Sequence, residues 1–195
     1  MSARRMLLLA AVLAVLTLGA CATPGTLASI PLSDTQADLV ERWQGFADRV
    51  LDSYHLAHVR LIVQRRPDTE GVMATSLRTR IIIIDPRALD SRMIPGLAHE
   101  LGHVVSGKVP DPAHQEEYEK DANFRAVAIL VVGRHTSEEA AFHQMRELLA
   151  AIATARAKLG TRAPAYHNAC AEVFDLDRHF PQYPVPSVPA CEAAR

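Results

Sequence analysis

The chain has 195 residues, of which 49% are hydrophobic and 22% are charged. This length and composition suit one domain with a hydrophobic core and exclude disorder, collagen and coiled coil as its main character. The 21 basic and 22 acidic side chains balance, so the sequence has no strongly basic character and we expect no nucleic-acid partner. The cysteines at positions 21, 170 and 191 are too far apart for a zinc knuckle or a redox pair.

The amino terminus has the layout of a secretory signal peptide. Arg4 and Arg5 precede a run over residues 6–18 that is apolar except for Thr17, and small residues follow it. A helix that spans a membrane needs about 20 apolar residues, which is more than this run supplies. We therefore expect an exported chain rather than a transmembrane anchor.

The segment Leu18-Gly19-Ala20-Cys21 resembles the lipobox of bacterial lipoproteins. In those proteins a lipid is attached to the cysteine, and cleavage occurs just before it. The resemblance implies a signal peptide over residues 1–20, a lipidated Cys21 and a place in the bacterial cell envelope. Because Ala22 follows the cysteine where an inner-membrane lipoprotein often has Asp, it favours the outer membrane, facing the periplasm.

Residues 21–32 are rich in proline, glycine and small polar side chains and are predicted to be a linker. The folded domain would then cover residues 33–195. Export places Cys170 and Cys191 in an oxidising compartment, where two remaining cysteines more often pair than stay free. We expect a disulfide between them that closes the carboxyl-terminal tail.

The first predicted element is a helix over residues 33–54, where apolar side chains recur every three or four residues. Ser33 and Gln36 can form a capping box at its start. The pattern then changes to three short β-rich runs, over residues 59–63, 72–77 and 80–84. The four isoleucines at 81–84 indicate a strand that is buried on both faces or shielded at an edge.

Three further helices are predicted, each ended by a glycine. They run from Asp90 or Ser91 to about Ser106, from Pro112 to Val132, and from Thr136 or Ser137 to Leu159; the glycines are Gly107, Gly133 and Gly160. Beyond them, four prolines between positions 181 and 189 predict an extended, non-helical tail. The fold class is therefore α+β, with a small three-stranded sheet packed on four main helices.

The segment His99-Glu100-Leu101-Gly102-His103 lies on the second predicted helix. Residues four apart on a helix share a face, so both imidazoles can bind one Zn²⁺. Glu100 is next to the first ligand and can reach a water molecule at the metal without binding the metal itself. In that position it can act as the catalytic base of peptide-bond hydrolysis.

A catalytic zinc needs a third protein ligand, and the next helix offers several carboxylates. The segment from Glu119 to Ala126 resembles the E-x-x-A-D/N-x-x-A signature of the gluzincin metallopeptidases. The resemblance implies Glu119 as the third ligand and Asn123 as the support of a ligating histidine. A second register would make Glu117 the ligand and Asp121 the support, but it places Lys120 and Phe124 where the family has alanine. We favour Glu119.

The order of sheet, H-E-x-x-H helix and glutamate helix resembles the CAAX prenyl endopeptidases and the HtpX-type proteases over roughly residues 59–150. The resemblance implies a minimal zincin-like metallopeptidase that holds one zinc ion per chain. It also implies that residues 72–77 form an edge strand on which a peptide substrate pairs. The group that stabilises the oxyanion in this family has no secure counterpart, and the candidates are Arg162, Tyr166 and His167.

Two functions from different classes follow from these residues. The first is a zinc-dependent endopeptidase at the bacterial envelope, with a protein or peptide substrate and a membrane contact through its lipid. The alternative is a catalytically silent zinc-binding lipoprotein that acts as a binding or assembly module. A third possibility is a structural envelope lipoprotein whose helices carry the motif by chance. Glu100 favours the enzyme, because a purely structural zinc site has no evident use for a carboxylate that does not bind the metal.

Overall fold

The structure is a computed structural model, and it describes residues 30–66, 72–158 and 164–194. The predicted signal peptide, Cys21 and most of the predicted linker lie outside these residues. Within them, no helix has both the length and the apolar character that crossing a membrane requires.

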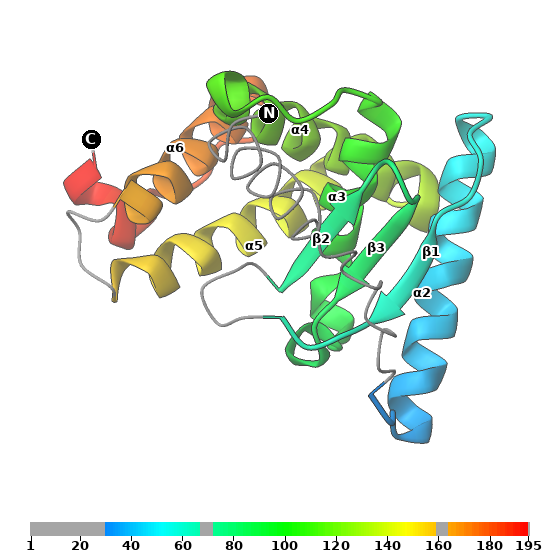
Figure 1. The fold of residues 1–195 in the computed structure, drawn as a ribbon. Coiled ribbons are helices and arrows are strands. Elements are labelled where there is room, and N and C mark those ends of the chain that lie inside the picture. Colours follow the sequence, from blue (N-terminus) through cyan, green and yellow to red (C-terminus); the bar gives the residue numbers. More distant parts are fainter. Residues whose placement is uncertain (1–29, 67–71, 159–163, 195) are drawn as a thin grey trace, which may run out of the picture.

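The described part of the chain has an α+β fold, as predicted, with five α-helices and one small sheet (Figure 1). The helices are α2 (Asp34–Ser53), α3 (Ile94–Ser106), α4 (Gln115–Arg134), α5 (Glu138–Ala157) and α6 (Pro164–His179). The strands are β1 (Arg60–Val63), β2 (Met73–Ser76) and β3 (Ile81–Ile84).

The strands are arranged in the order β1-β3-β2, with β1 parallel and β2 antiparallel to β3. The isoleucine strand is therefore central, and the alternative that placed it at a shielded edge is wrong. Ile82 and Ile84 are fully buried, whereas Ile81 and Ile83 on the other face are half-buried. The edge at β2 lies next to α3, and this position makes β2 one wall of the site described below.

The helix starts follow the predicted capping residues. Ser33 and Gln36 form the capping box at the start of α2. Asp90 caps a short 3-10 turn over Ser91–Met93 that leads directly into α3. Pro95 falls in the first turn of α3, where a missing backbone N–H removes no helical hydrogen bond.

Gly107 ends α3 with a left-handed backbone (φ 63°), as predicted, but Gly133 does not end α4. The helix continues to Arg134, and His135 has the left-handed conformation instead (φ 51°). A Cβ atom on Gly133 would lie 2.4 Å from Cε2 of Phe46 and 2.8 Å from Cγ2 of Val50. Glycine is present here because α2 packs against α4 at this point, which a reading of helix-end signals does not detect.

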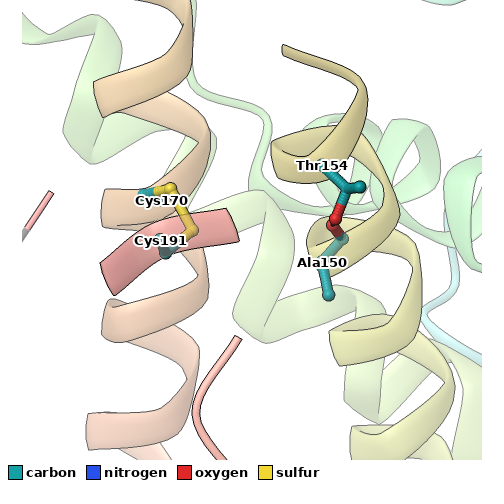
Figure 2. The surroundings of a disulfide bond; sticks show 4 residues. All are labelled: Ala150, Thr154, Cys170 and Cys191. Carbon is teal, nitrogen blue, oxygen red and sulfur yellow. A yellow bond between two sulfur atoms is a disulfide. The ribbon is translucent and has the colours of Figure 1, made fainter. Parts of the chain in front are cut away.

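Helix α6 was not predicted, so the described fold has five main helices rather than four. Cys170 of α6 forms the predicted disulfide with Cys191, which lies in a 3-10 helix over Pro189–Ala194 (Figure 2). The tail is therefore not wholly extended: Pro189 begins a helical turn, a position that proline tolerates. Gly160, the predicted end of the preceding helix, lies outside the described residues.

Candidate metal centre

Three side chains from two helices bring one donor atom each to the same point. His99 and His103 are one turn apart on α3, and their Nε2 atoms lie 3.1 Å apart. Glu119 of α4 faces them. Its Oε2 atom lies 3.1 Å from Nε2 of His99 and 3.4 Å from Nε2 of His103. The three side chains therefore form a group that can bind a metal ion.

The close approach of α3 and α4 places Glu119 opposite the histidines. A Cβ atom on Gly102 would lie 2.6 Å from the backbone oxygen of Ala122 and 3.0 Å from its Cα. Ala122 itself is fully buried. The glycine inside the H-E-x-x-H segment thus removes the side chain that would hold the two helices apart.

The residues present fit a zinc ion. Tetrahedral zinc with bonds of about 2.0–2.1 Å holds neighbouring ligand atoms about 3.3 Å apart. The three separations in this group, 3.1, 3.1 and 3.4 Å, are close to that value. Two imidazoles and one carboxylate are also a usual donor set of catalytic zinc, with the fourth position left for water or substrate.

A hydrogen-bond chain that crosses to α6 orients His99. Its Nδ1 atom lies 2.7 Å from Oδ1 of Asn123, and Nδ2 of Asn123 donates to Oε2 of Glu172 at 3.1 Å. Because the amide oxygen can only accept, His99 donates from Nδ1, and Nε2 is the atom that faces Glu119 and that a metal ion would bind by displacing its proton. Asn123 is 1% exposed, so solvent does not compete for these bonds.

Glu172 was missed together with its helix. The signal that could have revealed the helix is the spacing of its apolar side chains, which recur every three or four residues at Ala169, Val173, Leu176 and Phe180. The prolines that follow indicate only an extended tail. No local pattern links Glu172 to Asn123, 49 residues earlier. Only the packing of α6 against α4 brings them together.

Glu100 lies beside this group and is fixed by the sheet. Its Oε2 atom accepts a hydrogen bond of 2.7 Å from Oγ1 of Thr75, and the same hydroxyl lies 3.1 Å from the backbone oxygen of Glu100. Thr75 belongs to β2, so the edge strand determines where the carboxylate points. No sequence signal singled out Thr75, which is 25 residues away along the chain.

The second histidine is held by a ring contact. The imidazole of His103 stacks on the ring of Tyr118, with 4.1 Å between centroids and 15° between planes. In the part of the chain that the structure describes, its Nδ1 atom has no hydrogen-bond partner. The stack therefore takes the orienting role that a hydrogen bond has for His99.

The two acids near the histidines shape the titration of the site. Burial alone lowers the pKa of His99, but the hydrogen bond to Glu119 and the charges of Glu100 and Glu119 outweigh it and raise the pKa to about 9. Burial opposes ionisation of Glu119, yet hydrogen bonds from the two histidines hold its pKa well below the usual value. Glu119 is therefore an anion at neutral pH, the form in which a carboxylate binds metal.

The alternative register does not bring its residues to the group. Glu117 is exposed on α4 and is not a member of the metal-binding group. Asp121 instead accepts hydrogen bonds from Ser106 and Arg125, at 2.7 and 2.9 Å. Of the three predicted oxyanion candidates, Arg162 lies outside the described residues, as do the side chains of Tyr166 and His167 in the first turn of α6.

The group opens into a cavity of about 400 Å³. Its polar end contains the metal-binding group, Glu100, Tyr118 and Glu172. Burial, followed by the charges of Glu119 and Glu100, raises the pKa of Tyr118 to about 12, so its hydroxyl keeps its proton at neutral pH. Most of the remaining wall comes from β2, the start of α3 and one face of α5.

A comparison with protein-family models matches residues 55–161 to the IrrE N-terminal-like domain. The chain belongs to this family. IrrE N-terminal-like domains are a zincin-like metallopeptidase family, so the match confirms the metallopeptidase-like character predicted from the H-E-x-x-H segment. No curated protein and no solved structure matches the chain.

The part of the chain that matches the IrrE N-terminal-like domain includes the whole sheet and helices α3, α4 and α5. All three members of the metal-binding group and Glu100 lie in it. Glu172 and the disulfide lie beyond the matched residues. The resemblance to the CAAX prenyl endopeptidases and HtpX stays a prediction.

Proposed function

We propose that this IrrE N-terminal-like protein is a zinc-dependent endopeptidase that acts at the bacterial cell envelope. The observation that carries the proposal is the placement of Glu100. Its carboxylate lies in the same cavity as His99, His103 and Glu119, outside the metal-binding group and fixed by Thr75. This is the arrangement in which a carboxylate acts on water while its neighbours bind the metal.

The chemistry divides between the metal and the carboxylate. Zinc bound by the three side chains would polarise the substrate carbonyl and lower the pKa of water to about 7. Glu100 takes one proton from the attacking water as the water oxygen bonds to the carbonyl carbon of the substrate. It then gives that proton to the nitrogen of the leaving amine as the C–N bond breaks. Asn123 and Tyr118 keep the two imidazoles in place throughout.

The substrate would be an extended peptide that pairs with β2. This strand is at an edge of the described sheet, and residues 72–75 line the cavity next to Glu100. A peptide that adds a strand to such an edge gains main-chain hydrogen bonds without a sequence requirement. A scissile bond placed in this way lies beside the metal-binding group.

The envelope location rests on the amino terminus alone. The lipobox-like segment that ends at Cys21 supports export, cleavage before Cys21 and a lipid anchor in the outer membrane. Labelling with radioactive palmitate tests this part of the proposal. The wild type should incorporate label and sediment with membranes, and Cys21→Ser should do neither; a wild type without label contradicts the anchor.

The test of activity compares Glu100→Gln with Glu117→Gln in the full chain, using an unfolded protein as substrate. Glu100→Gln should keep its metal and lose at least 100-fold in hydrolysis, the lower range for a general base. Glu117→Gln makes the same chemical change on an exposed residue and should remain active. Metal-loaded wild type without hydrolysis contradicts the enzyme and favours the alternative of a catalytically silent module.

A further inference from the structure

Part of the cavity is lined by apolar side chains, and this part is called its apolar end. One face of α5 forms its wall, where helical spacing places the side chains in a row, and β2 and the residue before α3 complete it. The side chains are Met73, Met93, Met145, Leu148, Leu149 and Ile152. The histidines and acidic residues that line the cavity all belong to its polar end: His99, Glu100, His103, Glu119 and Glu172.

A missing side chain keeps this end open. A Cβ atom on Gly96 would lie 3.5 Å from Cε of Met93, 3.6 Å from Sδ of Met73 and 3.7 Å from Cδ2 of Leu148. These are ordinary contact distances, and Gly96 lies within α3, where other residues adopt the same backbone. A longer side chain at this position would enter the space between the three walls.

The apolar end is continuous with the site, because the residues that line it and the side chain of Glu100 belong to one cavity. We propose that it binds a bulky apolar side chain of the substrate, adjacent to the bond that is cleaved. The inference rests on the proposed function and adds to it the class of residue recognised. The three methionines have flexible, polarisable side chains, so the pocket should accept leucine, methionine and phenylalanine alike.

Cleavage of a peptide series tests the preference. The series has one length and varies the two residues that flank the central bond among Leu, Met, Phe, Ala, Asp and Lys. At one of the two positions, kcat/KM should be at least roughly tenfold higher for the bulky apolar residues than for Ala, Asp and Lys. Equal rates at both positions overturn the proposal.

Filling the pocket tests where the preference arises. Gly96→Leu should remove the advantage of Phe and Leu while peptides with Ala at the same position are cleaved as before. The control is Gly45→Leu on α2, where the nearest atom to the new Cβ is the flexible end of Arg49 at 3.5 Å. It should keep the full preference of the wild type. An unchanged preference in Gly96→Leu overturns the proposal.

A negative charge introduced at Ile152, which lines the apolar end, should give the enzyme a new preference for Lys. Ile152 is 38% exposed, so Ile152→Glu can be accommodated without a buried charge. This variant should cleave peptides with Lys at the selected position roughly tenfold faster than the wild type does. Val132 on α4 is 39% exposed and does not line the cavity, which makes Val132→Glu a matched control. A Lys preference that is absent from Ile152→Glu, or present in both variants, contradicts the assignment.

Binding separates this inference from the proposed function. Calorimetry on metal-loaded Glu100→Gln measures the affinity for the same peptides without turnover. Tighter binding of Leu and Phe peptides supports the pocket even where the wild type hydrolyses none of them, a result that would contradict only the endopeptidase. Hydrolysis by the wild type with no difference in affinity or rate among the peptides contradicts only the pocket.

Discussion

Asn123 and His99 are joined by a hydrogen bond of 2.7 Å between Oδ1 of the amide and Nδ1 of the ring. Asn123 is four residues after Glu119 on α4, so both side chains share one face of that helix. One helix face thus supplies a donor atom of the metal-binding group and the support of another donor. Glu172 extends the arrangement to α6, since its carboxylate accepts from the same amide.

Removing the amide should weaken metal binding without unfolding the protein. Asn123→Ala leaves His99 free to rotate and to change tautomer, and we expect a loss of 10- to 100-fold in zinc affinity, as for other partners of ligating histidines. Competition with a chromogenic chelator measures it. Asn168→Ala, an exposed asparagine on α6, is the control and should bind zinc as the wild type does. Equal affinities for the two variants contradict the orienting role.

Two buried glycines should have separable effects. Gly102→Ala forces α3 and α4 apart at the backbone of Ala122, and Gly133→Ala meets the side chains of Phe46 and Val50. Each should lower the free energy of unfolding by about 1–3 kcal/mol, as overpacking does. Only Gly102→Ala should also lower zinc affinity, because α3 and α4 carry the donor atoms. Urea denaturation and zinc titration measure the two effects, and unchanged zinc affinity in Gly102→Ala contradicts the role assigned to this glycine.

The disulfide should matter for stability and not for the site. Cys170 and Cys191 are separated by 21 residues, and closing a loop of that length contributes about 3 kcal/mol in the chain-entropy account. The double variant Cys170→Ala/Cys191→Ala should unfold at a lower temperature than the oxidised wild type, and a reductant should lower only the wild-type value. Equal melting temperatures with and without reductant in the wild type contradict the bond.

Asp85 predicts an acid-sensitive contribution to stability. Its carboxylate is 1% exposed and accepts hydrogen bonds from Nε of Arg87 at 2.8 Å and from the backbone N–H of Arg66 at 2.7 Å. The Arg87 side chain, followed by the backbone donors, outweighs burial and holds the pKa of Asp85 well below its usual value. The contribution is therefore complete above the unfolded-state pKa of about 4 and is lost as the pH falls below it.

Asp85→Asn should accordingly lower the free energy of unfolding by roughly 2 kcal/mol at neutral pH. The difference from the wild type should shrink as the pH falls below about 4, because the unfolded wild-type chain then takes up a proton that the folded protein resists. Urea denaturation at neutral pH and at about pH 3 measures the free energy of unfolding of both proteins. Asp38→Asn, on the exposed side of α2, should show little difference at either pH. A constant Asp85→Asn difference across the range contradicts the assignment.

The site was largely predictable because its signals are local. His99, Glu100 and His103 are fixed relative to one another by a single helix, and the spacing of Glu119 and Asn123 is helical too. Capping residues such as Ser33 act within one helical turn, so the start of α2 was also predictable from the sequence.

The remaining features depend on contacts between distant segments. Gly133 looks like a helix end, and only its contact with Phe46 explains its place inside α4. Thr75 and Glu172 reach the site from β2 and α6, and neither has a neighbour in sequence that reveals its role. The apolar pocket likewise requires α5 to pack opposite β2, which periodicity alone does not determine.

The most direct test of the metal centre is the zinc content of three proteins, measured by native mass spectrometry. Wild type and Glu117→Gln should each carry one zinc ion per chain, and Glu119→Gln should lose it under the same conditions. The two variants make the same chemical change two residues apart on α4, and only Glu119 faces the histidines. Absence of zinc from the wild type, or its retention in Glu119→Gln together with its loss from Glu117→Gln, would contradict the account.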